Sequence, residues 1–300
     1  MKSLSTEKQK GIVAIFILAL VWGLLPLIPR FLNIHFQLFQ QVYLRMFVGL
    51  LFSLLFFSKQ IRFKRILQIS VRDFALIFFR ATTYFVLGVV LNTQAILLTK
   101  ISNVTLIGTI PFTAILGFLL LREKVTVKKI ALVILSFLGA LIVAIKTSSH
   151  FSVGMGELFA LLSALSTSFA LISRKWQSKF LNDQETSTLV LFFAAIEISI
   201  ISFFMKEGLP IHNWTLSTII FLAIAGILNT ATSYFFNYGM ARVDAVLSGN
   251  ILMLEPVLAS FFAFLVFREF PVGREVVGGV IIIVSVVFMH RLEGRTSKEK

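Results

Sequence analysis

One pattern occurs twice along this chain, and it restricts the fold more than any other feature. Each copy is an apolar run with a single proline in its first half, Pro111 or Pro256, and each copy ends in an Arg-Glu pair before a second apolar run begins. The prolines are 145 residues apart (256 − 111), and the two glutamates, Glu123 and Glu269, are 146 apart (269 − 123). Self-similarity at one spacing in a chain of 300 residues indicates a duplicated half.

The two halves are expected to lie in a membrane, because the composition excludes an ordinary soluble domain. Hydrophobic residues make up 57% of the chain and charged residues only 14%, whereas about 25% charged is usual in soluble domains. A helix needs about 20 apolar residues to cross the hydrocarbon core of a bilayer. The sequence predicts an all-α integral membrane protein with ten such helices, at residues 11–29, 36–57, 74–98, 104–121, 128–145, 154–173, 187–205, 214–238, 245–267 and 273–290.

The distribution of Lys and Arg predicts the orientation. If the N-terminus lies in the cytoplasm, the cytoplasmic connections carry most of the basic residues, as the positive-inside rule requires. This placement accounts for the net charge of +14 without a nucleic-acid partner. Both termini are therefore expected on the cytoplasmic side.

The odd number of helices in each half predicts how the halves are related. Five spans in residues 1–147 place the second copy, residues 148–300, upside down relative to the first. Inverted repeats recur in secondary transporters, because two such halves open alternately to either side of the membrane. The fold expected from the sequence is therefore ten transmembrane helices in two inverted five-helix repeats.

Polar residues inside the predicted spans are candidates for a cavity. In the eighth span, Asn229, Ser233 and Asn237 recur at i, i+4 and i+8 and predict one polar face, with Tyr234 beside it. Two interpretations stay open for such stripes: a tight contact between helices, which small polar residues permit, or the wall of a water-filled cavity. Further polar or aromatic candidates inside the spans are Trp22, Tyr84, Asn92, Phe112 and Ser163.

Four ionisable residues lie well inside the spans: Arg45, Arg80, Glu197 and Glu255. Each costs about 2.5 to 3.5 kcal/mol at the bilayer centre, so such residues usually face a bundle interior and are paired. Glu255 precedes Pro256, which loosens the helix backbone at that point. Glu255 is either a site for a proton or a cationic substrate group, or one half of an internal ion pair with Arg45 or Arg80. Glu197 is interpreted as a structural or interface residue.

The sequence lacks the motifs of the main catalytic classes. It has no G-x-x-x-x-G-K-[ST] phosphate loop, which excludes an ATP motor within the chain, and it has no cysteine. The 4 histidines are isolated from one another, at or beyond span ends, which argues against a metal site or a nucleophile-histidine pair. We expect no catalytic residue, no metal and no cofactor, in a chain that is not an enzyme.

Several stretches resemble those of a known family. They are Ala19-Leu-Val-Trp22-Gly23, Arg45, Ile110-Pro111 with Arg122-Glu123-Lys124, Gly156-Glu157, and Leu254-Glu255-Pro256-Val257 with Arg268-Glu269. Together they are similar to the drug/metabolite transporter (DMT) superfamily, in particular the ten-helix EamA-type transporters with two EamA repeats. The resemblance implies an inner-membrane protein with a central cavity that moves small metabolites such as amino acids. Phe78-Phe-Arg80-Ala81 also looks like the subset that contains S-adenosylmethionine uptake proteins.

The function expected from these observations is secondary transport by alternating access, with export favoured. The substrate is a small polar metabolite, an amino acid or a related compound, bound in a cavity at the midplane. The candidate substrate-binding residues are Trp22, Arg80, Tyr84, Asn92, Phe112, Ser163, Asn229, Ser233, Tyr234, Asn237 and Glu255, and the candidate helix breaks are Pro111 and Pro256.

Two other classes of function remain open. One is an uncoupled uniporter or exchanger, S-adenosylmethionine-type uptake included. The other is a membrane enzyme or accessory protein, which needs an acid/base pair or a metal cluster. The expected partners are the small-molecule substrate and the lipid bilayer, while protons and a second copy of the chain stay open as partners.

Overall fold

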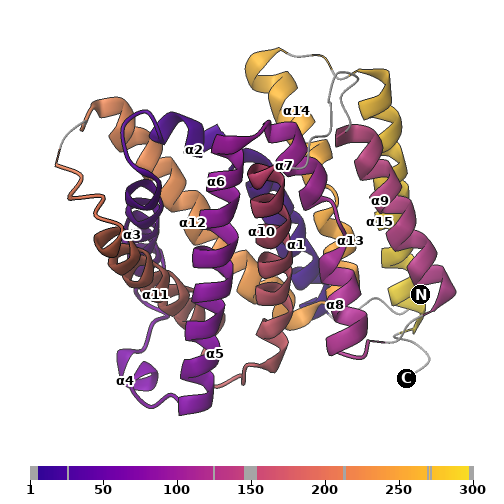
Figure 1. The fold of residues 1–300 in the computed structure, drawn as a ribbon. Coiled ribbons are helices and arrows are strands. Elements are labelled where there is room, and N and C mark those ends of the chain that lie inside the picture. Colours follow the sequence, from indigo (N-terminus) through magenta and orange to yellow (C-terminus); the bar gives the residue numbers. More distant parts are fainter. Residues whose placement is uncertain are drawn as a thin grey trace.

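The structure, a computed structural model, describes residues 6–25, 27–123, 126–144, 154–211, 214–268, 270 and 272–296. Within these ranges all regular secondary structure is helical, and the helices pack into one bundle (Figure 1). Glu269, the second glutamate of the duplicated pattern, lies outside the described residues, as does Lys124. The expected all-α class is confirmed for the described part of the chain.

The helices follow the apolar runs of the sequence. In chain order they are α1 (Thr6–Leu24), α2 (Leu27–Leu32), α3 (Leu38–Phe56), α4 (Phe63–Ile66), α5 (Val71–Ala81), the π-helix η1 (Thr82–Val90), α6 (Leu91–Leu98), α7 (Ile101–Gly108), α8 (Phe112–Leu120), α9 (Val127–Ala144), α10 (Met155–Ser173), the 3₁₀-helix η2 (Arg174–Trp176), α11 (Asp183–Phe204), α12 (Leu216–Arg242), α13 (Ala245–Leu252), α14 (Glu255–Phe267) and α15 (Gly273–Thr296).

Eight segments of the described chain are long and apolar enough to cross a membrane. They are Leu38–Phe56, Val71–Leu98, Asn103–Leu120, Met155–Trp176, Asp183–Phe204, Leu216–Arg242, Ala245–Phe262 and Gly273–Glu293. The other two expected spans, 11–29 and 128–145, overlap α1 and α9 but are not among the eight. Multiple membrane passes are thus supported, and the number of ten stays a prediction.

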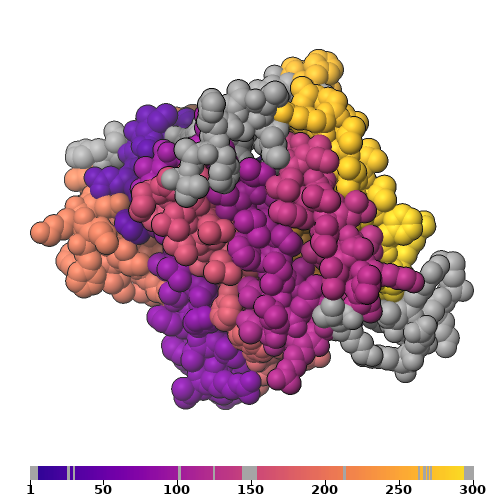
Figure 2. Space-filling model, turned by 45° about the vertical axis from the view of Figure 1, so that its right-hand side comes forward, coloured from indigo at the N-terminus to yellow at the C-terminus, as the bar shows by residue number. Residues whose placement is uncertain are grey.

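The outer faces of the bundle are apolar, as contact with lipid requires. Ile130, Ile134 and Leu138 recur at helical spacing on α9, and all three are exposed. The neighbouring α15 exposes a similar row: Val276, Val280, Ile283 and Val287. Figure 2 shows α9 in magenta beside α15 in yellow on one face of the molecule. Rows of exposed aliphatic side chains are unusual on a soluble protein and are what a lipid-facing surface requires.

Helices of the first half pack against helices of the second half in a regular way. Among the most extensive contacts, α3 packs on α11, α8 on α13, and α9 on α15. The first helix of each half contacts the third span of the other half: α1 packs along α12, and α10 packs along η1 and α6. The core of the bundle is therefore built between the halves, and its residues come from both.

Two spans at corresponding positions of the halves are interrupted. The first interruption separates α7 from α8, and Pro111, with φ −78° and ψ 47°, precedes α8 directly. The second separates α13 from α14, and Pro256 lies in the first turn of α14. Because proline has no backbone N–H, each position leaves a carbonyl of the preceding turn without its helical partner. The role of the two prolines as hinges stays a prediction.

The turn after α8 is held against the second half by Glu123. Its carboxylate accepts the backbone N–H groups of Ala245, at 2.6 Å, and Val246, at 3.0 Å. These are N–H groups of the first turn of α13, which have no partner within their own helix. The favourable helix dipole adds to the interaction, since a negative charge lies at a helix N-terminus.

We predict that Glu123→Ala lowers the free energy of unfolding by about 2 kcal/mol, because two charge-assisted hydrogen bonds are lost at a buried helix end. Thermal unfolding in detergent micelles measures the effect. The matched control is Glu7→Ala, which removes an exposed carboxylate that pairs with Lys10 and Arg242. Surface pairs contribute little, so an equal loss in both variants would contradict the capping role.

Candidate functional site

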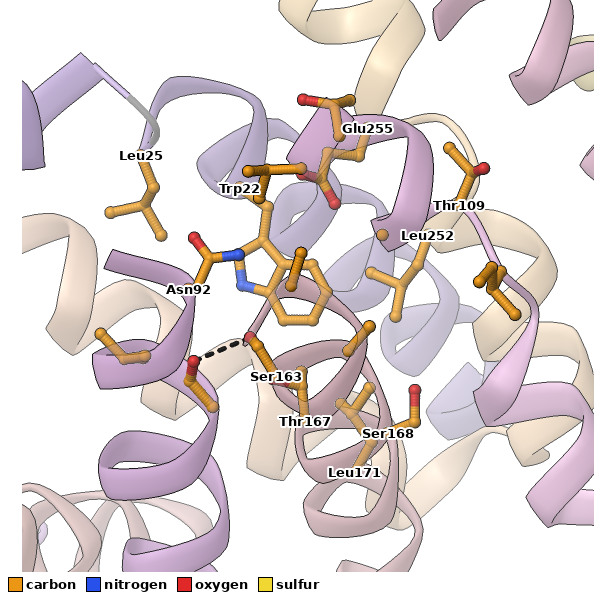
Figure 3. A pocket seen from close by; sticks show the side chains of 18 of the residues that line it. Trp22, Leu25, Asn92, Thr109, Ser163, Thr167, Ser168, Leu171, Leu252 and Glu255 are labelled. Atoms are coloured by element: carbon orange, nitrogen blue, oxygen red, sulfur yellow. Dashed lines mark hydrogen bonds between the residues drawn. The ribbon is translucent and has the colours of Figure 1, made fainter. Parts of the chain in front are cut away.

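A cavity of about 190 Å³ lies where the two interrupted spans meet. The α7–α8 interruption contributes Gly108 to Pro111, and the α13–α14 interruption contributes Met253, Glu255 and Pro256. The remaining walls come from α1, α2, α3, η1, α6, α7, α8, α10, α12 and α13, so both halves of the chain line the cavity. Figure 3 shows labelled side chains from α1, α6, α10 and α14 around the same space.

Two residues of opposite charge line this cavity without neutralising each other. Arg45 is 3% exposed, and its Nε donates to the carbonyl of Gln41, at 3.2 Å, while one Nη donates to the Thr93 hydroxyl, at 3.3 Å. Glu255 also lines the cavity, at the first turn of α14. In the described part of the chain neither residue forms an ion pair within 4.0 Å, so the internal pair of Glu255 with Arg45 or Arg80 is not formed in this conformation.

Aromatic rings form another part of the wall. Trp22 of α1 stacks on Tyr84 of η1, with ring centroids 6.4 Å apart and an interplanar angle of 28°. Tyr84 stacks in turn on Phe236 of α12, at 5.4 Å and 20°. The buried Trp22 Nε1 has no hydrogen-bond partner of normal geometry among the described residues. A buried N–H donor without a partner costs free energy, and a ligand acceptor in the cavity would remove that cost.

Hydroxyl groups of α10 form another part of the cavity lining. Ser163 donates to the carbonyl of Gly88, at 2.8 Å, as the dashed line in Figure 3 shows. One turn further, Thr167 lies so close to Gly88 that a Cβ at this glycine would come within 2.7 Å of the Thr167 hydroxyl oxygen. Glycine at position 88 therefore allows η1 and α10 to approach, and the approach presents the hydroxyls of α10 to the cavity.

Amide side chains complete the polar lining. Asn92 of α6 lines the cavity and directly precedes Thr93, whose hydroxyl accepts a hydrogen bond from Arg45. Asn229 of α12 lines it from the second half, and its Nδ2 donates to the carbonyl of Ala225, at 2.7 Å. The cavity therefore offers one cation, one anion, aromatic faces and neutral hydrogen-bonding groups to a small molecule.

Most of the residues proposed from the sequence lie around this cavity. Those that line it are Trp22, Tyr84, Asn92, Pro111, Ser163, Asn229, Glu255 and Pro256. Those that lie outside its lining are Arg80, Phe112, Ser233, Tyr234 and Asn237. The residues brought together come from six separate helical segments, which only the packing of the bundle makes neighbours.

The polar stripe of α12 divides between two environments. Asn229 lines the cavity, whereas Ser233 and Ser187 each donate to the other's backbone carbonyl, at 3.1 Å. Asn237 donates to the Ser187 hydroxyl, at 3.1 Å. Each step of four residues moves the side chain about 6 Å along the helix, so the stripe leaves the cavity and enters the contact with α11. The stripe therefore lies partly at the cavity and partly in a contact between helices.

Tyr234 and Phe112 take other positions. Tyr234 is half-buried and packs against the ring of Phe57, with centroids 5.0 Å apart, on the side of α12 that faces α3. Phe112 begins α8 and is half-buried outside the cavity lining. Arg80 is fully buried one turn before Tyr84, where its guanidinium meets the connection after η2 and the helix α12.

Sequence reasoning left out Arg45 as a cavity residue. A signal was present, because Arg45 lies at the same depth in its span as Glu255 does in its own, and an arginine at the midplane rarely faces lipid. The hydroxyls of Thr93, Thr113 and Ser168 were also left out, and they gave no clear signal, because single Thr and Ser residues are common within apolar helices.

Comparisons with known proteins bear on the fold and the family. The family described as "EamA-like transporter family" matches the chain twice, over residues 9–145 and 154–291. Among solved structures, one crystal structure superposes with a TM-score of 0.80 over 96% of this chain and 98% of its own, at 14% sequence identity. At this identity the likeness concerns the fold alone.

Curated relatives are similar to part of the chain. An uncharacterized transporter of Synechocystis is 25% identical over 219 residues, which are 67% of this chain and 61% of the relative. The uncharacterized transporter YoaV of Bacillus subtilis is 27% identical over 189 residues, 62% of this chain and 64% of the relative. An S-adenosylmethionine uptake transporter of Rickettsia bellii is 26% identical over 193 residues, 63% and 62%. The aligned part spans less than two thirds of each relative's length.

Proposed function

Since the chain belongs to the EamA-like transporter family, within the DMT superfamily, we propose that it is a secondary transporter that carries a zwitterionic metabolite of amino-acid type by alternating access. Membership of the family and the apolar spans support a transporter. We propose the zwitterionic class of substrate, the alternating-access mechanism and the inverted arrangement of the two halves. The observation that carries it is the pair of unneutralised charges, Arg45 and Glu255, in one central cavity.

The charges of Arg45 and Glu255 suit a zwitterionic substrate, because each charged group of the substrate meets a side chain of opposite charge. The guanidinium of Arg45 matches a carboxylate, which accepts two parallel N–H bonds from arginine. The carboxylate of Glu255 suits an ammonium group. Aromatic faces of Trp22 and Tyr84 offer a surface for the apolar part of the substrate or for the ammonium group itself.

The size of the cavity favours a small substrate. Sites for drug-sized ligands are usually about 300 to 1,000 Å³, and this cavity measures about 190 Å³. S-adenosylmethionine is the second candidate, since relatives carry that name and the molecule contains an amino-acid zwitterion and a purine that could stack on Trp22. It requires a wider cavity than the present conformation provides, so we place it second.

Three features support two halves related by a two-fold axis in the membrane plane. The contacts between the halves are reciprocal: the first helix of each half packs against the third span of the other, α1 on α12 and α10 on η1 and α6. Such reciprocity is what a two-fold arrangement produces. The family matches the chain twice, and Arg122 and Arg268, which are 146 residues apart (268 − 122), both adopt a left-handed backbone, with φ of 51° and 57°. In an inverted pair these turns lie on opposite sides of the membrane.

Uptake into proteoliposomes tests the proposed substrate class. The probes are radiolabelled amino acids, each compared with the amine that lacks its carboxylate and the acid that lacks its ammonium group. We expect at least one amino acid to be transported, and its two single-charge analogues to be transported poorly. Transport of a single-charge analogue in preference to every zwitterion would reject the substrate class, and transport of S-adenosylmethionine alone would favour the second candidate.

Accessibility labelling tests the inverted arrangement. Because the chain has no cysteine, a single cysteine at Thr126 or at Phe270 reports directly on the side of the membrane. Both residues are exposed and follow the two corresponding turns. We expect a membrane-impermeant maleimide to label the two positions from opposite sides. Labelling of both from the same side would rule out inverted halves.

A further inference from the structure

We propose that Arg80 forms a second anion-binding site for the substrate carboxylate, separated from the central cavity by the stacked aromatic rings. The substrate would meet Arg45 and Glu255 on one side of this barrier and Arg80 on the other. The identity of the substrate rests on the proposed function, whereas the existence of an anion site at Arg80 rests on the geometry described next.

Arg80 is a fully buried cation that is held by neutral groups. Its two Nη atoms donate to Gln177 Oε1, in the connection after η2, and to Asn237 Oδ1, near the end of α12. It is 0% exposed, its Nε has no hydrogen-bond partner, and it makes no ion pair with a carboxylate within 4.0 Å in the described chain. Amides orient a guanidinium but do not neutralise its charge, so the site can still accept an anion.

The surroundings of Arg80 carry more positive than negative charge. Asp183 accepts from Arg174, at 2.9 Å, and from Arg242, at 2.7 Å, so one carboxylate already serves two other guanidinium groups. Arg174 is 5% exposed, and its Nε also lacks a hydrogen-bond partner among the residues that the structure describes. Two buried arginines with unused donors, next to a carboxylate that is fully engaged, form a local excess of positive charge.

Aromatic rings lie between Arg80 and the central cavity. The guanidinium carbon of Arg80 lies 5.2 Å from the centre of the Phe236 ring. Phe236 stacks on Tyr84, and Tyr84 stacks on Trp22, which lines the cavity. The rings of Tyr84 and Phe236 therefore lie between the cavity wall and the buried cation.

The position of Arg80 defines the side of the membrane to which the second site belongs. Asn237 lies five residues before Arg242, at the end of α12 that contacts Glu7 at the beginning of α1. We call this the α1 face of the bundle. The cavity residue Asn229 lies two turns further from the same face. Movement of the rings would therefore transfer a carboxylate from Arg45 toward the α1 face, where Arg80 receives it.

Charge-selective labelling tests the site without any substrate. In the cysteine-free chain, Asn237→Cys places one thiol beside Arg80. The reagents are an anionic and a cationic methanethiosulfonate, added at the α1 face in sealed vesicles, with rates normalised to a free thiol. We expect the anionic reagent to react about tenfold faster, because local positive potential concentrates anions. We expect Arg80→Gln to remove this preference, with Asn237→Cys retained.

Equal rates for the two reagents, reaction only from the opposite face, or a preference that survives Arg80→Gln would each overturn the proposal. A failure to react at all would overturn it too, because the site must open to this face during transport. A failed amino-acid uptake assay with a positive labelling result would instead reject the substrate class and retain the anion site.

A second variant separates an anion site from a structural role of Arg80. Asn237→Asp gives the guanidinium a permanent carboxylate partner. If Arg80 binds the substrate carboxylate, this variant keeps or gains thermal stability, yet its transport rate falls at least about tenfold because the resident carboxylate competes. If Arg80 only orders the bundle, stability and transport are both retained, and that outcome would refute the proposal.

Discussion

Glu255→Gln is expected to reduce the transport of a zwitterionic amino acid at least about 30-fold, which corresponds to about 2 kcal/mol. The substitution keeps the size and hydrogen-bonding shape of the side chain but removes the negative charge that meets the substrate ammonium group. Without the counter-charge, an ammonium group that enters the cavity loses solvation and gains no ion pair. Initial rates of uptake into proteoliposomes measure the effect.

Glu197→Gln is the matched control for this experiment. Glu197 is the other carboxylate deep inside a predicted span, it is half-buried on α11, and it does not line the cavity. We expect its neutralisation to leave transport within about twofold of the wild-type rate, as for a residue remote from the site. Equal losses in the two variants would indicate a general effect of neutralising carboxylates in the bundle.

Arg45→Gln extends the test to the other charge. It should weaken transport of the amino acid but not of the amine that lacks the carboxylate, while Glu255→Gln should spare the acid that lacks the ammonium group. Each variant should thus no longer favour the amino acid over the analogue that lacks the group bound by the removed charge. If Glu255→Gln transports the amino acid as the wild type does, Glu255 is structural and the zwitterion hypothesis is wrong.

Gly226→Leu is expected to prevent stable folding, with a loss of about 3 kcal/mol or more. Gly226 of α12 meets α3 so closely that a Cβ at this position would lie 2.4 Å from Val48 Cγ1 and 2.9 Å from the Val48 backbone carbon. The same contact contains the hydrogen bond from Thr230 to the carbonyl of Gly49, at 2.7 Å. Small residues allow two membrane helices this approach, and a larger side chain must separate them.

The folded fraction in detergent, measured by size-exclusion chromatography and thermal unfolding, tests this prediction. The control is Gly273→Leu, because a Cβ at Gly273 meets nothing within 4 Å. We expect the control to fold like the wild type. Normal stability of Gly226→Leu would show that α3 and α12 are less tightly packed than the structure describes.

The sequence by itself determined the class of the protein and much of its helical framework. Apolar runs of membrane length and the low content of charged residues predict a helical membrane protein. Both features depend only on local hydrophobicity, so they can be recognised without the tertiary structure. The duplicated prolines Pro111 and Pro256 indicated where spans are interrupted, because proline acts on its own helix. The stretches around Trp22 and Glu255, together with the others that recur in both halves, resembled the family that the comparison then confirmed.

Only the tertiary structure decided which polar residues meet. A polar residue in an apolar span indicates that its side chain avoids lipid, but it does not indicate which helix provides the partner. Asn229 faces the cavity while Ser233, one turn away, binds α11, and Arg80 meets Gln177 and Asn237 instead of a carboxylate. The sequence left open whether Glu255 pairs with an arginine. Among the described residues, the packing leaves Arg45 and Glu255 without an ion pair in one cavity. Helix rotation and the contacts between the two halves are long-range properties, which local sequence does not determine.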